Sequence, residues 1–298
     1  MHIHAYKDSK VVFQSLKEFG LKSTLKHALG CLGIGVYSTV KYPIIGFEAV
    51  VRANTFWKEL ERGRWELNCI RYLSNIIRKG QTLLDVGAWI GPYTILFSKL
   101  TQATGRVYAF DPDPKAFNIL QENVEKNSLT NVSIERICVS NSVGKAAIGT
   151  CSLGNSKTHL VKHRKRARLT EIIAETTTID EFCEENAICP DGIKIDVEGA
   201  ELEVLKGATG LLSSSSRPVV MCELADIRTE PWDYRSCEIY EFLETYDYRW
   251  FSVTPEGRLR PCPRKEQYHE SLIAVPEEIL SAVAAFVERS GQECTELM

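Results

Sequence analysis

The sequence predicts an α/β fold with a doubly wound, mostly parallel sheet of seven strands that ends in a C-terminal antiparallel hairpin. Two patterns support this prediction. From residue 82 onward, short runs of β-branched and other apolar residues alternate five times with patterns of helical spacing. After the fifth unit, two more strand-like runs follow with no helix between them. Strands joined by helices pair in parallel and place helices on both faces, so the five units and the closing pair give this sheet.

The region before the first unit predicts an extension, a strand and a helix. We expect an N-terminal helical extension, a main domain and a C-terminal tail, over residues 1–46, 47–285 and 286–298. "FEAVVRA" at 47–53 predicts a strand, because valines and alanines fill a short run. One helix is expected over 56–79, ended by Gly80. Its apolar positions follow helical spacing at Trp65, Cys69, Tyr72, Leu73, Ile76 and Ile77.

The five units follow in order, each a strand and then a helix. The expected strands are "TLLDVGA", "GRVYAFD", "VSIERIC", "GIKIDVEG" and "PVVMCEL". The expected helices cover 92–100, 114–127 with Pro114 near its first turn, a helix begun by "TTTIDEFCEEN" with Thr178 or Asp180 as its cap, "AELEVLKGA" closed by Gly207, and "SCEIYEFLETYDY". Residues 141–178 read as irregular or strand-like, and "RWFSVTPEGRL" and "ESLIAVP" as the closing antiparallel pair.

Composition and charge restrict the function classes. Hydrophobic residues make up 44% and charged residues 25%, which is typical of a globular protein that buries a full core. The net charge of −3 gives no general attraction to nucleic acid. The ten cysteines include no C-x-x-C pair and no Cys/His cluster at zinc spacing, so they predict free thiols and a reducing, cytoplasmic compartment. A metal held by Asp196, Glu198 and an acid of the second unit's strand is conceivable, but nothing in the spacing demands one, and no metal site is predicted.

Two segments bear on membranes and charged partners. Residues 28–51 are rather apolar, but Lys41, Pro43 and Glu48 interrupt them, so no transmembrane span is expected. The helix-like region 11–32 either packs on the domain or makes peripheral membrane contact. The basic run "KTHLVKHRKRAR" at 157–168 is either a solvated face or a site for an anionic or nucleotide-linked acceptor or an anionic lipid. Aromatic residues do not interleave it, which disfavours nucleic acid.

The turn after the first unit's strand indicates the ligand. Gly87 and Gly91 are spaced G-x-x-x-G, which differs from the G-x-G-x-x-G of dinucleotide-binding turns. Ala88 and Trp89 would crowd a diphosphate there. Asp111 ends the second unit's strand, where an acid can accept hydrogen bonds from both hydroxyls of a ribose. A ribose-binding acid beside a turn without pyrophosphate geometry favours S-adenosylmethionine.

Acidic residues gather at the ends of two later strands. Lys194, Asp196 and Glu198 fall on one side of the fourth unit's strand by period two, and Glu223 ends the fifth unit's strand. Charges on a buried strand are costly unless they are paired or used in chemistry. One interpretation is a buried ion pair between Lys194 and a carboxylate. The other is a catalytic role, with Asp196, Glu198 and Glu223 as candidates for a general base and Glu198 favoured.

These blocks together resemble the FkbM family of methyltransferases, within the Rossmann-like class I fold that uses S-adenosylmethionine. The resemblance rests on "LLDVGAWIGPYT", "GRVYAFDPDPKAFNILQENVEKN", "TTTIDEF" and "IKIDVEGAELEVLKGA", and extends over about residues 50–275. It implies a set of cofactor-binding positions at the methionine, ribose and adenine groups and near the methyl group. These are Asp85, Gly87, Ala88 and Gly91 for methionine, Asp111 for ribose, Ile137 and Cys138 for adenine, and Asp196, with Glu198, for the methyl group or the acceptor. Trp89 departs from the family, which usually has Asn there.

The expected function is therefore methyl transfer from S-adenosylmethionine to a hydroxyl of a glycan, glycolipid or secondary metabolite, with the glycan preference implied by the family alone. Two alternatives stay open. An NAD-binding oxidoreductase is disfavoured by the missing G-x-G-x-x-G and by the lack of a Tyr-x-x-x-Lys proton donor set. A cofactor-binding module that has lost catalysis is favoured only by Trp89.

Overall fold

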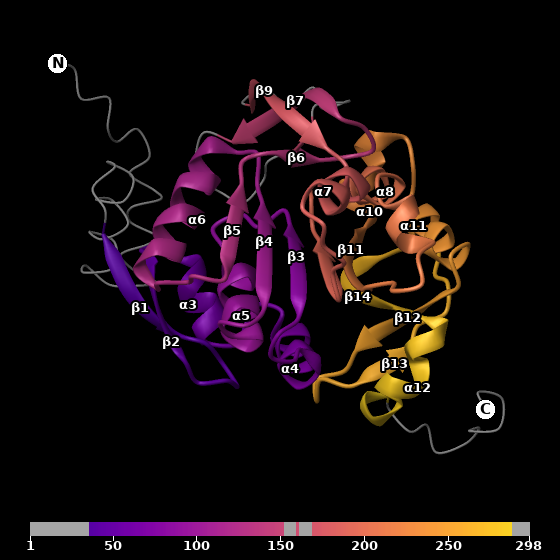
Figure 1. Cartoon of the computed structure of the whole chain (residues 1–298), viewed down its shortest axis with the longest axis horizontal. Helices are drawn as coiled ribbons and strands as arrows, with labels where there is room; N and C mark the ends of the chain where they lie inside the picture. The colour runs from indigo at the N-terminus through magenta and orange to yellow at the C-terminus, as the bar shows by residue number, and fades with distance from the viewer. Residues whose placement is uncertain (1–35, 152–158, 161–168, 288–298) are drawn as a thin grey trace. The chain divides into compact units, whose positions relative to one another are not determined.

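The computed structural model describes residues 36–151, 159–160 and 169–287, and the chain divides into two compact units, 1–67 and 68–298 (Figure 1). In the first unit, strand β1 (Tyr37–Lys41) pairs antiparallel with β2 (Glu48–Arg52), and helix α3 (Phe56–Glu61) follows. The strand expected at 47–53 is confirmed. The expectation of only helix and loop up to residue 46 is wrong for β1; the helices expected earlier lie outside the described residues.

The single helix expected over 56–79 is two helices, α3 and α4 (Leu67–Ile76). The residues between them contain two left-handed positions, Gly63 at φ 67° and Glu66 at φ 41°. A left-handed residue cannot continue a right-handed helix, so the apolar spacing restarts after this break. The buried face of α4 nevertheless uses the expected positions Cys69, Tyr72 and Leu73.

The second unit is built on an eight-stranded sheet with the order β13-β12-β14-β11-β10-β3-β4-β5. Its strands are β3 (Thr82–Val86), β4 (Arg106–Phe110), β5 (Val132–Glu135), β10 (Gly192–Ile195), β11 (Val219–Ala225), β12 (Tyr248–Val253), β13 (Leu259–Pro261) and β14 (His269–Pro276). Neighbouring strands in the run β11-β10-β3-β4-β5 pair in parallel. Strand β14 pairs antiparallel with both β11 and β12. The expected α/β fold and closing hairpin are confirmed. The strand count differs from seven because the short edge strand β13 adds to β12.

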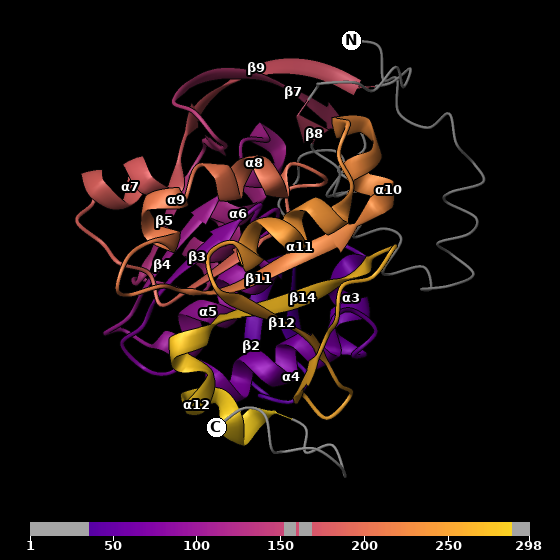
Figure 2. The same ribbon diagram turned by 90° about the vertical axis from the view of Figure 1, so that its right-hand side faces the viewer.

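Helices cover both faces of this sheet. They are α5 (Pro92–Thr101), α6 (Pro114–Lys126), α7 (Ile179–Glu185), α8 (Glu201–Lys206), α9 (Thr209–Leu212), α10 (Asp226–Thr229), α11 (Ser236–Glu244) and α12 (Leu280–Val283). Figure 2 shows α8 and α11 on one side of β11 and β14, with α5 and α12 on the other. The Thr178 side chain caps α7 as expected, by accepting the N–H of Glu181. The buried core between these layers is apolar and joins strand residues such as Leu84, Ile195 and Leu224 to helix residues such as Val204 and Leu243.

A second sheet lies between β5 and α7 in the chain. Its order is β6-β9-β7-β8, with β6 (Cys138–Val139), β7 (Gly144–Cys151), β8 (His159–Leu160) and β9 (Leu169–Thr177). The strand-like interpretation of 141–178 is thus confirmed for β7 and β9. The strand expected at "VSIERIC" is confirmed as β5 in the main sheet, but it ends at Glu135, and Cys138 belongs to β6, which pairs with β9. Most of the basic run at 157–168 lies outside the described residues.

Two further findings concern thiols and membranes. Among the described side chains, seven cysteines are free thiols, and Cys138, Cys183 and Cys222 are buried as their apolar contexts predicted. Within the part of the chain that the structure describes, no helix has both the length and the apolar character needed to cross a membrane.

Candidate active site

The turn from β3 to α5 is a tight backbone cradle. Gly87 lies at φ 78°, Trp89 at φ 51° and Gly91 at φ 90°, all in the left-handed region. A Cβ on Gly87 would lie 1.9 Å from the carbonyl oxygen of Asp196, so only glycine lets this turn pack against the end of β10. The N–H groups of Gly87 and Ala88 both donate to the carbonyl of Phe110 at the end of β4. The turn is therefore fixed from both neighbouring strands.

Asp111 lies beside this turn, as the sequence predicted. Its Oδ2 accepts the backbone N–H of Trp89 at 2.8 Å, and its Oδ1 accepts that of Asp113 at 2.9 Å. The carboxyl group is buried, and burial raises its pKa to about 7, although both N–H groups act in the opposite direction. Trp89 thus contributes through its backbone to the placement of Asp111.

Cys138 lies close enough to Asp111 for the carboxylate charge to act on its thiol. Burial raises the pKa of the Cys138 thiol to about 12, and the negative charge of Asp111 adds to that shift. Ile137 is partly buried against the main core. The structure therefore brings the start of β6 towards the end of β4, where the family resemblance places the adenine group.

Lys194 forms the buried ion pair that the sequence left as one interpretation. Its Nζ donates to the carbonyl of Gly87 at 2.8 Å and lies 3.4 Å from Asp85 Oδ1 and 3.6 Å from Asp196 Oδ2. Asp85 is fully buried, and its Oδ2 accepts the hydroxyl of Thr94 at 2.6 Å. Asp85 therefore lies beneath the turn and fixes it through Lys194 and Thr94.

The turn from β10 to α8 sends Asp196 and Glu198 in different directions. The strand ends at Ile195, and Glu198 takes a left-handed φ of 58°. Its Oε2 lies 2.6 Å from the guanidinium of Arg228 in α10. The period-two argument holds for Lys194 and Asp196, but the left-handed turn gives Glu198 a different partner.

Two residues of this turn were not among the candidates from the sequence. Glu201 is 1% exposed, and its Oε1 accepts the N–H groups of Val197 at 3.0 Å and Gly199 at 3.1 Å. The Tyr234 hydroxyl donates to the carbonyl of Gly199 and accepts the N–H of Leu202 at 3.3 Å. In the sequence Glu201 looks like an ordinary first-turn helix residue, and only its place in "DVEGAE" sets it apart.

Three carboxylates meet at the carboxyl ends of β10 and β11. Asp196, Glu201 and Glu223 each place one oxygen within 4.8 Å of the others. Burial, together with the neighbouring carboxylates, raises the pKa of Glu223 to about 9 and that of Glu201 to about 7, although Arg228 acts in the opposite direction on Glu223 and backbone N–H groups do so on Glu201. The structure thus places Asp196 and Glu223 together, as expected. The third carboxylate of this cluster is Glu201, where the sequence had suggested Glu198.

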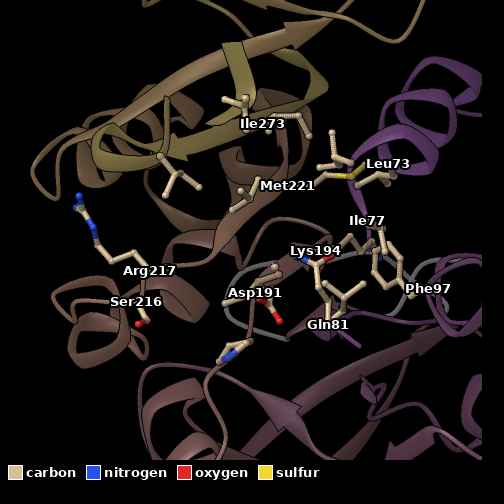
Figure 3. Close-up of a pocket in the computed structure, with 18 of the residues that line it drawn as sticks. Leu73, Ile77, Gln81, Phe97, Asp191, Lys194, Ser216, Arg217, Met221 and Ile273 are labelled. Carbon is tan, nitrogen blue, oxygen red and sulfur yellow. The ribbon is translucent and has the colours of Figure 1, made fainter. Parts of the chain in front are cut away.

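The described residues of the second unit line cavities at both ends of the sheet. An open one of about 700 Å³ adjoins α10, beyond the carboxyl end of β11, and its lining includes Asp226, Tyr234 and Glu238. The other has a volume of about 320 Å³ and a mostly apolar lining. It lies at the amino-terminal ends of β10 and β11, and Asp191 and Arg217 are among the residues that line it (Figure 3). Ligands of open α/β sheets bind at the carboxyl ends of the strands, so the first cavity is on the side of the candidate site.

Comparison with known proteins gives relatives of this chain. Residues 85–250 match the family described as the methyltransferase FkbM domain. The hexuronic acid methyltransferase AglP of Haloferax volcanii is 33% identical over 158 residues, which are 53% of this chain and 62% of that protein. A ribosomal protein L11 methyltransferase of Desulforamulus reducens is 41% identical over 64 residues, 22% of this chain and 20% of its own. The chain thus spans less than two thirds of the length of these curated relatives.

Among solved structures, a methyltransferase FkbM from Methylobacillus flagellatus KT is similar, with a TM-score of 0.44 and 18% sequence identity. The similarity covers 70% of this chain and 47% of that chain.

Proposed function

Because the chain belongs to the FkbM methyltransferase family, we propose that it transfers a methyl group from S-adenosylmethionine to a hydroxyl group of a glycan, glycolipid or secondary metabolite. The observation that carries this proposal is the glycine turn, with Asp111 fixed beside it by the backbone N–H of Trp89. The name of the relative AglP, a hexuronic acid methyltransferase, supports a sugar as the acceptor.

The residues present fit S-adenosylmethionine. A Cβ on Gly87 would meet the backbone of Asp196, so the turn presents bare backbone towards its neighbour strand. Asp111 uses each carboxylate oxygen for one N–H and keeps lone pairs for ribose hydroxyls. We propose that Gly87, Ala88 and Gly91 bind the methionine part, with Asp196 next to it, and that Ile137 and Cys138 flank the adenine. Asp85 is proposed as a positioning residue.

When bound, S-adenosylmethionine supplies a methyl group activated by a sulfonium sulfur. The protein must bring an acceptor oxygen into line with it, and such positioning is worth about 7–11 kcal/mol of the barrier. Asp196 and Glu223 are proposed to hold the acceptor, since they lie at the ends of adjacent strands. Glu198 is proposed as the general base. Its Oε2 lies 2.6 Å from the Arg228 guanidinium, which holds the side chain in place, and its carboxylate could take the hydroxyl proton as the carbon–oxygen bond forms.

Calorimetry tests the cofactor assignment. The full chain is titrated with S-adenosylmethionine, S-adenosylhomocysteine and NAD. We expect the two adenosyl compounds to bind and NAD to give no heat, because the turn lacks pyrophosphate geometry. Binding of NAD alone would contradict the proposal and favour an oxidoreductase.

Radiolabelled transfer tests the acceptor class and catalysis together. The chain is incubated with S-adenosylmethionine labelled on the methyl group and with glycan, lipid and small-molecule fractions of a cell extract. We expect label in a sugar-containing fraction, in a linkage stable to mild base as an ether is. Cofactor binding without label in any fraction would favour the module that has lost catalysis.

The Glu198→Gln variant tests the proposed base. The amide keeps the shape of the side chain but cannot accept the proton, so kcat should fall about 10²- to 10⁴-fold while the Kd for S-adenosylmethionine stays within about twofold. Glu203→Gln is the matched control, because Glu203 is already bound to Lys206 at 2.9 Å. Equal kcat values for the two variants would exclude Glu198 as the base.

A further inference from the structure

Four carboxylates lie near the end of β10, and the Lys194 ammonium group contacts two of them. Lys194 is the cation within 4.0 Å of Asp85 and Asp196, and among the described residues no Lys or Arg lies within that distance of Glu201 or Glu223. Asp196, Glu201 and Glu223 nevertheless place oxygens within 4.8 Å of one another. Like charges at such distances, partly removed from water, repel strongly. Lys194 beside Asp196 and the guanidinium of Arg228, which acts on Glu223 from outside the cluster, are fewer cations than the carboxylates gathered here, so a further positive charge would stabilise the cluster.

One oxygen in the cluster has no partner. Oε1 of Glu201 accepts the N–H groups of Val197 and Gly199, which hold the carboxylate in place. Oε2 is buried and accepts no hydrogen bond from any described residue. A buried acceptor without a donor costs about 1–3 kcal/mol, so native structures rarely leave one unused. This oxygen is the independent sign of a missing ligand.

The donor set selects the chemistry of that ligand. All three donors are carboxylate oxygens, which hard divalent cations such as Mg²⁺, Mn²⁺ and Ca²⁺ prefer. The cluster itself contributes no imidazole and no thiolate; the thiol of the neighbouring Cys222 falls on the opposite face of β11 from Glu223. Asp196 is exposed enough to leave coordination positions open to water or to a substrate oxygen.

We infer that Asp196, Glu201 and Glu223 bind one divalent metal ion at the carboxyl ends of β10 and β11. Glu201 is its rigid ligand, held by two backbone N–H groups, and Asp196 and Glu223 complete a three-carboxylate face. The ion binds independently of S-adenosylmethionine. Its role, to hold neighbouring oxygens of the acceptor on its open positions, rests on the proposed function.

Electron paramagnetic resonance with Mn²⁺ tests the site directly. Free Mn²⁺ gives a six-line signal that is lost on binding, and the titration uses the full chain at pH 7.5 without cofactor or acceptor. We expect one Mn²⁺ per chain with a Kd of about 1 mM or tighter, and displacement by excess Mg²⁺. No loss of signal up to about 5 mM Mn²⁺ would overturn the inference.

Matched variants place the ion. Glu201→Gln and Glu223→Gln should each weaken Mn²⁺ binding at least about tenfold, since each removes one charged ligand. Glu203→Gln on the same helix should bind as the unchanged chain does, because its carboxylate is engaged with Lys206 and Asn141. Far-ultraviolet circular dichroism verifies that each variant is folded. If Glu201→Gln does not fold, Mn²⁺ binding by Glu223→Gln alone tests the assignment. Unchanged affinity in the folded variants, or equal loss in Glu203→Gln, would contradict the assignment.

The same preparations separate this inference from the proposed function. S-adenosylmethionine is titrated in the presence of EDTA. Cofactor binding without Mn²⁺ binding would overturn the metal site and leave the methyltransferase proposal intact. Mn²⁺ binding without cofactor binding would contradict the methyltransferase proposal and leave the metal site intact.

Discussion

Lys194 puts a single ammonium group between a fully buried carboxylate, Asp85, and the partly exposed Asp196. Replacement by Met keeps much of the volume but leaves the Asp85 charge without a cation. We expect Lys194→Met to lower the free energy of unfolding by about 3–5 kcal/mol, measured by urea denaturation. Lys206→Met is the control, because Lys206 forms an exposed pair worth at most about 1 kcal/mol. Similar losses in the two variants would show that the buried pair contributes little.

Asp111 predicts a pH dependence of cofactor binding. Burial raises the pKa of its carboxyl to about 7, so the ionised fraction falls from about 90% at pH 8 to about 10% at pH 6. The protonated group has fewer acceptor positions for ribose hydroxyls. Affinity for S-adenosylmethionine, measured by calorimetry, should therefore be nearly full at about pH 8, about half of that at pH 7 and about tenfold lower at pH 6. Asp111→Asn should bind more weakly and lack this pH step; a step that persists would assign it to another group.

For single residues, the sequence predicts which side chains come together where their spacing follows backbone geometry. Period two correctly places Lys194 beside Asp196. It does not place Glu198, since that residue has left the strand and taken a left-handed φ. Glu201 could not be identified either, because its importance comes from burial and from the N–H groups that a folded turn directs at it.

The turn between β3 and α5 has no room for a side chain at Gly87. Gly87→Ala should destabilise the fold and abolish cofactor binding, because the new Cβ would lie 1.9 Å from the Asp196 carbonyl oxygen. Gly80→Ala separates this clash from backbone strain, since Gly80 also has a positive φ but its nearest neighbour would be 3.8 Å away. The control should cost about 1–2 kcal/mol and Gly87→Ala clearly more, by thermal unfolding. Equal costs would show that the close approach relaxes.

Element boundaries show where local patterns are insufficient. The apolar spacing over 56–79 indicates one helix, and an isolated glycine in a helix costs only about 1 kcal/mol, so Gly63 gives a weak signal for the break that occurs there. The run "VSIERIC" looks like one strand because its composition is uniform. Its division into β5 and β6 depends on partners, β4 and β9, that are distant in the sequence.

For the whole molecule, ligand binding should raise the unfolding temperature. At a concentration about 100 times Kd, a ligand that binds only the folded state adds about 2.7 kcal/mol. For a unit of this size that corresponds to a rise of roughly 5–10 °C with S-adenosylhomocysteine, and none with NAD. A rise with NAD of the same size would favour a dinucleotide site.

The parallel core of the sheet could be predicted because alternation and handedness leave few topologies. The position of β14 between β11 and β12 could not, since nothing local distinguishes it from an edge strand. The second sheet could not be predicted either, because β6 pairs with β9, which is distant from it in the sequence.

The placement of β14 has a consequence for synthesis on the ribosome. Strand β14 covers the edge of β11 in the register Val220↔Ala274 to Ala225↔His269. Strand β12 also pairs with β14, so it cannot join the sheet before β14 is made. While translation is still short of residue 269, the nascent chain therefore presents an open β-edge next to its largest apolar layer. Ribosome stalling in this interval would yield chains prone to aggregation, with chaperones as their natural protection.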